Sequence, residues 1–314
     1  MSKICHTAEL YKKLIQQSNN HYLLEWLFLN SKINFGVYIS NFGPNWSVSS
    51  LVELAKEAEK AGWDGFFIWD HIYVEDMPDT NVLDPFIVLA AIASQTKKIR
   101  IGTSVTPLAR RHPWKVARET ASLDQLSNGR FILGVGLGGD PINEFAAFGQ
   151  ESDDKIRGEM LDESLAILQG LWSGEKFAYN GKHYQIKETK FLPATVQRPT
   201  IPIWVGGNWP NKKPFRRAAR FQGVFPLLAN SYDGLEPKHY PDILTYIRKY
   251  QQQQNKPYDV VFMTNFFYWV SENKFDEMIS DYSSVGVNWF VHCIHPWTED
   301  INSLIQTVKN PPWK

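Results

Sequence analysis

Short apolar runs alternate along this chain with longer segments in which apolar residues recur at helical spacing. From residue 33 onward this alternation occurs eight times. The short runs predict buried strands, and the longer segments predict amphipathic helices. The predicted strands cover residues 33–39, 65–69, 99–104, 131–135, 201–205, 222–226, 260–267 and 289–293. Strands that alternate with helices in this way are typical of a parallel sheet with helical crossovers.

The longer segments carry residues that begin and end helices. Ser47 or Ser49 is placed to cap the first helix, and Gly62 follows its end. Serine side chains accept hydrogen bonds at helix N-termini, and glycine adopts the left-handed conformation that ends many helices. Pro113 suits the first turn of the third helix. The predicted helices cover residues 49–61, 85–95, 113–126, 155–172, 212–220, 241–253, 274–285 and 300–308.

Eight such units predict an α/β fold, a closed (β/α)8 TIM barrel over residues 33–314, a type that usually takes about 250 residues. Aromatic runs around Asn180-Gly181 predict a β-hairpin insertion near residues 177–190. An open doubly wound sheet is the alternative, but it usually places a phosphate loop in its first unit, where this chain has none. Residues 1–32 form an N-terminal extension with an amphipathic helical pattern that Ser18-Asn19-Asn20 breaks.

Four of the predicted strands end in small or polar residues. Because the carboxyl ends of parallel strands share one edge, we expect a single site there. Glycine is the usual residue where a backbone must approach a ligand closely. Asp70-His71 could hydrogen-bond a heterocycle or move a proton, or it could be a satisfied polar pair. The strand ends are Trp69-Asp70-His71, Gly102-Thr103-Ser104, Gly134–Gly139 and Gly206-Gly207-Asn208.

Two of the glycine-rich strand ends suggest phosphate binding. Gly134, Gly136 and Gly139 fit the GxGxxG spacing, but Asp140-Pro141 stands where a helix should receive a pyrophosphate. We therefore interpret that strand end as the border of a flat ligand, with a tight loop as the alternative. Residues 206–208 precede a predicted helix that carries four basic residues, and backbone N–H groups there could bind phosphate. The alternative is a plain turn followed by a solvated basic face.

Composition and charge exclude several classes of protein. Basic and acidic residues number 33 each, so the chain has no overall attraction to nucleic acid or to an acidic membrane. Apolar runs stay well below the roughly 20 residues of a membrane span, and we expect a cytoplasmic protein. Cys5 and Cys293 form no metal-binding or disulfide pattern. His292 and His295 have HxxH spacing without a recognisable third ligand, so no metal site is predicted.

Together, several sequence blocks resemble the luciferase-like monooxygenases, the flavin- and deazaflavin-dependent barrel oxidoreductases. The resemblance implies a flavin-type ring lying over the strand ends, backed by a non-prolyl cis peptide between Ser104 and Val105. The blocks that carry it are Ile68-Trp-Asp-His71, Asp84-Pro85, Gly102-Thr-Ser-Val-Thr-Pro107, Arg111-His-Pro-Trp114, Leu126-Ser-Asn-Gly-Arg-Phe131, Leu133-Gly-Val-Gly-Leu-Gly138 and Pro202-Ile-Trp-Val-Gly-Gly207.

The same resemblance implies an oxidoreductase that uses reduced FMN and molecular oxygen on a small organic substrate. One alternative is hydride transfer with an 8-hydroxy-5-deazaflavin coenzyme, and a second is a non-catalytic flavin-binding barrel. A separate flavin reductase and a homodimer are the expected protein partners. His71 and Asp70 are the implied catalytic residues. The implied cofactor-binding residues are Asp70, Thr103, Ser104, Val105, Gly136, Gly206, Gly207 and Asn208.

Overall fold

The computed structural model describes most of the chain from residue 32 onward. The described residues are 32–43, 46–77, 79–139, 144–229, 234–252, 256–264, 272–294, 301–311 and 313. The predicted N-terminal extension lies outside them, apart from Lys32.

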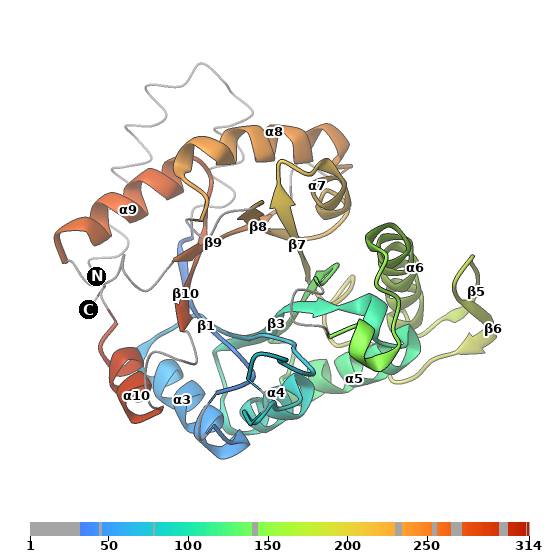
Figure 1. The fold of residues 1–314 in the computed structure, drawn as a ribbon, viewed down its shortest axis with the longest axis horizontal. Coiled ribbons are helices and arrows are strands. Elements are labelled where there is room, and N and C mark those ends of the chain that lie inside the picture. Colours follow the sequence, from blue (N-terminus) through green and yellow to red (C-terminus); the bar gives the residue numbers. More distant parts are fainter. Residues whose placement is uncertain are drawn as a thin grey trace.

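Eight parallel strands close into a barrel, which confirms the predicted (β/α)8 architecture and excludes the open sheet. The strand order around the barrel is β1-β10-β9-β8-β7-β4-β3-β2, and β2 returns to β1. Figure 1 looks along the barrel and shows the helices outside the ring of strands. The strands are β1 (Asn34–Ile39), β2 (Gly65–Ile68), β3 (Arg100–Pro107), β4 (Phe131–Gly136), β7 (Ile203–Trp209), β8 (Gly223–Leu228), β9 (Asp259–Thr264) and β10 (Trp289–Ile294).

Helices follow the strands with the predicted caps. Ser47 accepts the N–H of Ser50 at the start of the first described helix, and Gly62 ends it with φ of 89°. Pro113 opens the third helix as predicted. The helices are α3 (Val48–Ala61), α4 (Pro85–Gln95), α5 (Pro113–Leu126), α6 (Asp154–Trp172), α7 (Lys212–Ala218), α8 (Tyr240–Tyr250), α9 (Glu272–Ser284) and α10 (Ile301–Lys309), with short 3₁₀ turns η1 (Leu108–Arg110), η2 (Ala146–Phe148) and η3 (Pro237–His239).

Some predicted boundaries were wrong at the strand ends. β7 continues four residues beyond the predicted end because β8 pairs with it as far as Trp209. β3 likewise continues to Pro107, where it pairs with Gly136 of β4. The predicted strand 260–267 is observed as far as Thr264, and residues 265–267 lie outside the described part. Pairing across the sheet, which the local sequence does not reveal, sets these ends.

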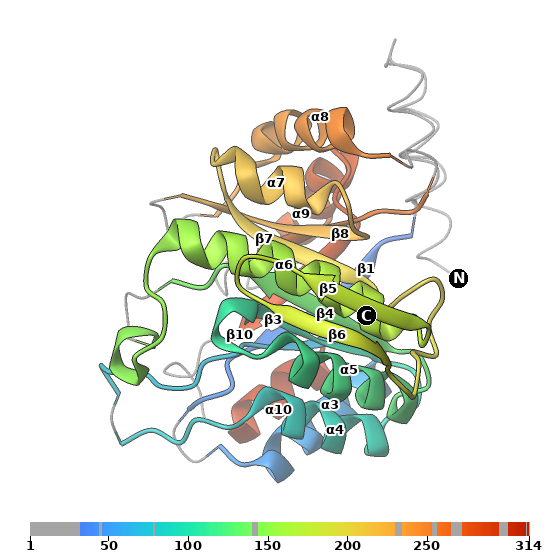
Figure 2. The ribbon, with the colours of Figure 1, turned by 90° about the vertical axis from the view of Figure 1, so that its right-hand side faces the viewer.

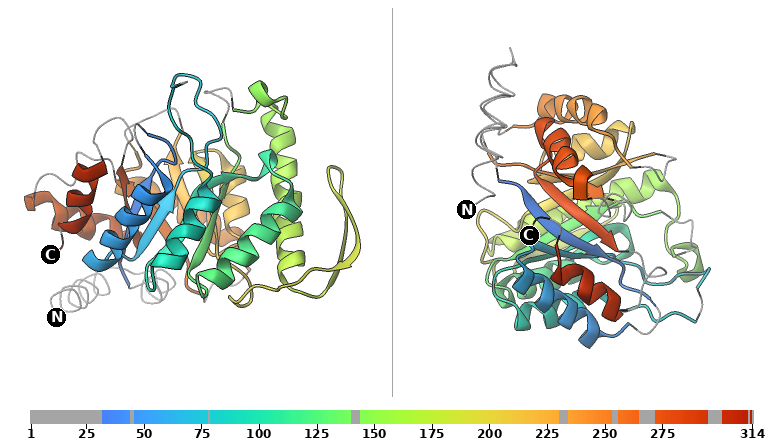
Figure 3. Two further views of the ribbon diagram at one scale, coloured as in Figure 1. Left: turned by 90° about the horizontal axis from the view of Figure 1, so that it is seen from below. Right: turned by 90° about the vertical axis from the view of Figure 1, so that its left-hand side faces the viewer.

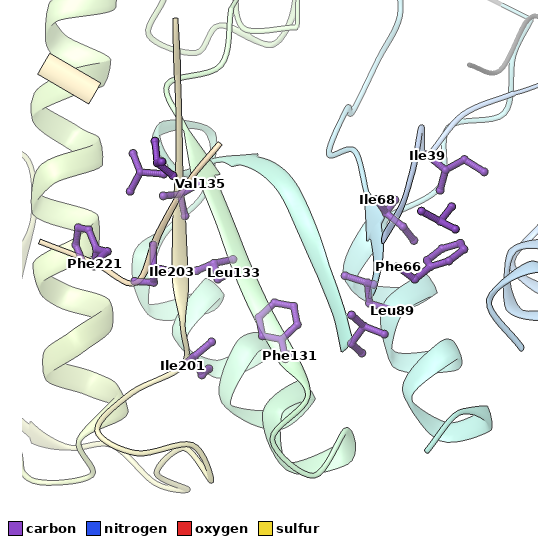
Figure 4. Close-up of a cluster of buried hydrophobic side chains, with 14 of the residues drawn as sticks. Ile39, Phe66, Ile68, Leu89, Phe131, Leu133, Val135, Ile201, Ile203 and Phe221 are labelled. Carbon is purple, nitrogen blue, oxygen red and sulfur yellow. The ribbon is translucent and has the colours of Figure 1, made fainter. Parts of the chain in front are cut away.

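Alternating side chains along the strands divide the core into two parts. Outward-facing residues pack against the helices, as the close-up in Figure 4 illustrates with Phe66 and Ile68 of β2 and Leu133 of β4. The interior of the barrel holds a second cluster that includes Phe67, Trp204 and Trp289. Both clusters are consistent with strands whose two faces are buried, the pattern expected of parallel sheets.

Aromatic rings fill the part of the interior near the strand starts. The ring centroids of Phe67 and Trp204 lie 4.8 Å apart, and those of Trp204 and Trp289 lie 5.1 Å apart. Both indole N–H groups donate to the Asp259 carboxylate, at 2.9 and 3.0 Å. A Cβ at Gly65 would lie 2.5 Å from the Phe67 ring, so glycine makes room for these rings. These rings leave the opposite, carboxyl end of the strands as the candidate place for a ligand.

The predicted hairpin insertion is present outside the barrel. It comprises β5 (Lys176–Asn180) and β6 (Gln185–Lys190), which pair in antiparallel fashion. Figures 2 and 3 show both strands on the outer side of α6, away from the barrel strands. The carboxylate of Glu163 on α6 accepts the backbone N–H groups of Lys182, His183 and Tyr184, which ties the hairpin turn to the helix.

Gly134 gives a direct test of packing between β3 and β4. A Cβ at this position would lie 2.1 Å from the carbonyl oxygen of Thr103, which is backbone and cannot rotate away. We expect Gly134→Ala to lower the free energy of unfolding by about 1–3 kcal/mol or more. Gly158→Ala is the matched control, because its nearest neighbour is the Leu137 side chain at 4.0 Å. Gly158 lies within α6, where replacement of glycine by alanine should raise the free energy of unfolding by about 0.5–1 kcal/mol. Urea unfolding of both variants measures the difference, and equal effects would contradict it.

Candidate functional site

A buried carboxylate lies at the carboxyl end of β2. The side chain of Asp70 has no exposed surface. Arg110 donates to its Oδ1 at 2.8 Å and to its backbone oxygen at 2.6 Å. Arg111 donates to Oδ1 at 2.7 Å and to Oδ2 at 3.1 Å. The structure thus places Asp70, predicted as a catalytic and cofactor-binding residue, between two arginines that follow β3.

A second buried carboxylate connects the arginines to His71. Glu144 accepts from Arg110 Nη1 at 2.8 Å and from the Ile72 N–H at 2.7 Å, both at Oε1. Its Oε2 lies 3.0 Å from Nδ1 of His71. Burial raises the pKa of Glu144, but the hydrogen bond and charge of His71, the Arg110 charge and the Ile72 N–H hold it below its ordinary value. Glu144 is therefore an ionised carboxylate at neutral pH.

The His71 ring stands partly open in an aromatic wall. Its side chain is 27% exposed, whereas those of Glu144 and Arg110 are 4% and 3% exposed. The ring lies 5.5 Å from Phe42 and 5.6 Å from Trp69, measured between centroids. Tyr38 extends the wall at 5.5 Å from Trp69. A flat aromatic molecule would find apolar ring surfaces and one imidazole edge at this end of the barrel.

The peptide bond between Ser104 and Val105 is cis, as predicted. The register that pairs Ile68 with Thr103 makes Trp69 and Ser104 neighbours at the rim. The Ser104 hydroxyl is buried and has no hydrogen-bond partner among the described residues. Thr103 is fully buried and its hydroxyl donates to the Gly134 carbonyl, so it belongs to the strand packing. The hydroxyl of Ser104 instead has no partner among the described residues, although buried polar groups are normally paired.

The glycines at the strand ends fit closely around Val105. A Cβ at Gly136 would lie 2.6 Å from the Val105 side chain, and one at Gly206 would lie 2.8 Å from it. Gly102, by contrast, faces the Ile132 carbonyl at 2.3 Å from its hypothetical Cβ and belongs to the packed interior. The strand-end glycines therefore serve two purposes: Gly102 allows close packing of neighbouring strands, whereas Gly136 and Gly206 make room for Val105.

The predicted phosphate-binding segment is part of a strand. Gly206 and Gly207 are half-buried and Asn208 is exposed, and all three pair with β8. The basic residues of α7 are largely engaged elsewhere: Arg217 donates twice to Asp162 at 2.8 Å, and Lys212 Nζ lies 3.4 Å from the centre of the Trp209 ring. β7 continues to Trp209, and a turn in which the Asn211 N–H donates to the Asn208 carbonyl leads into α7, so the alternative of a turn at this point has support.

Other sequence motifs contribute little to this site. Asp140-Pro141, which follow the GxGxxG spacing, lie outside the described residues, as does His295 of the HxxH pair. Across the described part of the chain, no three His, Cys, Asp or Glu side chains converge as metal ligands would. Burial raises the pKa of the Cys293 thiol to about 12, so this cysteine is a protonated interior residue. No helix among the described residues is long and apolar enough to cross a membrane.

Sequence reasoning missed three residues of the site. Arg110 and Arg111 follow a strand end directly, and two adjacent cations beside a predicted ligand edge were a usable signal. Glu144 gave no such signal, because it lies in the long segment between β4 and α6, where apolar periodicity is lacking. Only the folded chain brings it to His71, which is 73 residues away in sequence.

Comparison with known proteins agrees with this geometry. The model of the family described as luciferase-like monooxygenase matches residues 33–273. The chain belongs to the luciferase-like monooxygenase family. The match covers most of the described barrel, including Asp70, His71, Ser104 and Gly206. The family resemblance inferred from the sequence blocks is therefore confirmed, and the chain is an oxidoreductase of this family.

Relatives within the luciferase-like family use different cofactors. The chain is 32% identical over 181 residues to an F420-dependent glucose-6-phosphate dehydrogenase of Amycolatopsis mediterranei, covering 57% of this chain and 52% of that protein. It is 31% identical over 165 residues to the oxygenase component of a flavin-dependent trigonelline monooxygenase of Acinetobacter baylyi, covering 52% and 44%. The matches thus span about half the length of these curated relatives.

A solved structure supports the fold. An F420-dependent secondary alcohol dehydrogenase, in complex with an F420-acetone adduct, superposes with a TM-score of 0.70. The identity is 18%, and the superposition covers 88% of this chain and 97% of the other. At this identity the likeness shows the luciferase-like barrel fold alone.

Removal of the Asp70 carboxylate tests how much this group contributes to the free energy of unfolding. Asp70→Ala would remove the carboxylate that Arg110 and Arg111 share, and would leave their two positive charges with Glu144, which pairs with Arg110, and the more distant Asp84. We expect a loss of about 3–5 kcal/mol in the free energy of unfolding, since an uncompensated buried charge is costly. Glu188→Ala, which breaks an exposed pair with Lys176, should change stability little. Chemical denaturation of both variants measures this, and a small loss for Asp70→Ala would contradict the proposed network.

The lowered pKa of Glu144 predicts a pH dependence of stability. Because its folded-state pKa lies below the unfolded value of about 4.3, the carboxylate stabilises the fold above that pH. The contribution is lost as the pH falls through the folded-state pKa. We expect wild type to lose stability relative to Glu144→Gln over this acidic range, because glutamine does not titrate. Urea unfolding of both proteins from neutral pH down to about pH 2–3, past the unfolded-state pKa, gives the comparison. Parallel stability curves would contradict it.

Proposed function

We propose that this chain is a deazaflavin-dependent oxidoreductase that transfers a hydride between an F420-type cofactor and an alcohol or carbonyl substrate. The observation that carries the proposal is the His71–Glu144 pair that follows the end of β2. Each hydride exchanged between an alcohol and a carbonyl is accompanied by one proton on the substrate oxygen. An imidazole held by a buried carboxylate is suited to move that proton. The identity to F420-dependent dehydrogenases supports the same cofactor.

The rim residues fit a deazaflavin or flavin ring. Trp69 and Phe42 offer apolar ring surfaces, and Val105 offers a flat aliphatic support backed by glycines. The unpartnered hydroxyl of Ser104 could pair with a polar atom of the ring system. When bound, such a ring supplies the hydride-accepting carbon. We assign Ser104, Val105 and Gly136 to cofactor binding, and we assign Asp70 and Thr103 to positioning of the rim rather than to contact.

The phosphate end of the cofactor is assigned to the extended end of β7. β4 pairs with β7 only as far as Val205, whereas β8 continues to Trp209. The Pro202 carbonyl bonds to β4, and peptide groups alternate sides along a strand. The N–H of Asn208 therefore faces the β4 side beyond the last pair with that strand. We propose that this N–H, with the side chain of Asn208, binds the phosphate beside Gly206 and Gly207.

A second candidate is oxygenation with reduced FMN, which is the principal function inferred from the sequence. The identity to the trigonelline monooxygenase component favours it, and a separate flavin reductase would then be a partner. In that reaction His71 would serve as the proton donor. The same rim residues would hold the ring, so the geometry alone fits either cofactor.

Titration of the purified chain with each cofactor separates these functions. Binding of oxidised and reduced F420 and FMN is followed by fluorescence, and turnover is then tested with sugar phosphates and secondary alcohols under anaerobic conditions. Tight binding of F420 and alcohol-dependent loss of its absorbance are expected. Preference for reduced FMN together with oxygen consumption would overturn the deazaflavin proposal. Binding of a cofactor without turnover of any substrate would favour the non-catalytic flavin-binding barrel, and failure to bind either cofactor would overturn all three functions.

Variants of His71 and Asn208 should affect different measurements, turnover for His71 and F420 binding for Asn208. We expect His71→Asn to bind F420 within about threefold of wild type and to lower turnover on the order of 100-fold, since proton transfer is lost. Asn208→Asp places a negative charge at the proposed phosphate position, so it should weaken F420 binding while turnover at saturation persists. Cofactor titration and steady-state kinetics of both variants measure these effects. Unchanged turnover in His71→Asn would make the imidazole a structural group.

A further inference from the structure

We propose that Glu144 is a positioning residue that holds His71 in the tautomer protonated on Nδ1, so that Nε2 accepts the hydroxyl proton of an alcohol substrate. The inference rests on the proposed deazaflavin-dependent function and names the group that prepares its base. Glu144 touches neither substrate nor cofactor here and acts only through His71. Neither the sequence blocks nor the relatives assign a role to this glutamate.

The hydrogen bonds around Glu144 determine which atom donates to which. Oε1 already accepts two donors, the Ile72 N–H at 2.7 Å and Arg110 Nη1 at 2.8 Å. Oε2 is left to face Nδ1 of His71 at 3.0 Å. An ionised carboxylate can only accept hydrogen bonds, so Nδ1 must carry a proton. In the neutral imidazole the other nitrogen, Nε2, is then an acceptor.

The remaining contacts hold the His71 ring in place. The N–H of His71 donates to Asn41 Oδ1 at 3.1 Å, and its carbonyl accepts from Asn41 Nδ2 at 2.7 Å. The rings of Phe42 and Trp69 flank the imidazole. Among the described residues, no hydrogen bond reaches Nε2, and the side chain is 27% exposed. Nε2 is therefore the nitrogen available to a ligand.

The proton and electron balance of alcohol oxidation suits this arrangement. The C–H bond breaks and its hydrogen leaves with the electron pair as a hydride to the deazaflavin, which is reduced. The O–H bond breaks, its proton goes to Nε2, and a carbonyl forms. His71 becomes an imidazolium whose charge faces Glu144 directly. Arg110, Arg111 and Asp70 complete the charged groups of this network, and Asp84 lies 3.9 Å from Arg111.

Glu144→Gln provides a nearly isosteric test, because it should invert the tautomer. The amide oxygen would take the place of Oε1, where two donors, Ile72 and Arg110, require an acceptor. The amide NH₂ would then face Nδ1 and could only donate. Nδ1 must accept, so the proton moves to Nε2, which can no longer accept from an alcohol. Glu144→Ala serves as a second variant, in which neither tautomer is imposed.

The tautomer is measured directly in the full chain without any cofactor. Long-range proton–nitrogen NMR spectra of ¹⁵N-histidine-labelled protein distinguish the two neutral forms. The His71→Asn variant identifies the signals of His71 among the 8 histidines. In spectra of the neutral imidazole, we expect the Nδ1-protonated form in wild type, the Nε2-protonated form in Glu144→Gln and a mixture in Glu144→Ala. An Nε2-protonated wild type, or no change in Glu144→Gln, would overturn the proposal.

The second measurement is steady-state kinetics with F420 and the alcohol that proves to be a substrate in the turnover tests described above. We expect Glu144→Gln to keep F420 affinity within about threefold and to lower kcat for alcohol oxidation on the order of 100-fold. Glu59→Gln is the matched control, because Glu59 also accepts backbone N–H groups, at the start of β3 and far from His71. Its kinetics should equal those of wild type. An unchanged kcat in Glu144→Gln would refute the role, whereas absent F420 binding with the expected tautomers would refute only the proposed function.

Discussion

The buried carboxylate of Asp70 is the constraint on which the rim of this barrel depends. Taking charges out of water is expensive, and a buried ion pair persists only when its hydrogen bonds are nearly complete. Here two guanidinium groups, of Arg110 and Arg111, balance two carboxylates, of Asp70 and Glu144. The four side chains come from three separate segments, so their pairing fixes the end of β2, the turn after β3 and the long connection after β4 relative to one another. The imidazole of His71 contacts that network through Glu144, while Asn41 holds its backbone.

The rest of the barrel makes this rim the only suitable end for a ligand among the described residues. Near the strand starts, the rings of Phe67, Trp204 and Trp289 occupy the interior. Near the strand ends, the residues become small, and Val105 lies against two glycines instead of against large side chains. In β4 and β7 the sequence itself shows this division, because Phe131 and Trp204 come early in these strands and Gly136, Gly206 and Gly207 come later.

Local patterns predicted the elements of the fold well but missed the contacts of the site. Helical periodicity and capping residues such as Ser47 and Gly62 act within a few residues, so α4 and α5 were predicted at their observed bounds. The end of β7 and the partner of His71 depend on residues that are distant in sequence. Glycines gave a mixed signal for the same reason, since Gly102 serves interior packing and Gly136 serves the rim. The cis peptide was predicted correctly only through the family resemblance.

The protonation state of the rim bears on the choice between the two chemistries of this family. Hydride removal from an alcohol needs a proton acceptor before the reaction, whereas oxygenation needs a proton donor. An ionised Glu144 beside Nδ1 makes the neutral His71 an acceptor at Nε2, and only the imidazolium could donate there. Under the proposed function, the neutral ring would serve alcohol oxidation, and the reverse reduction of a carbonyl would require the protonated ring. Because the same carboxylate also stabilises the imidazolium, a single buried residue supports the base before the transfer and the cation after it.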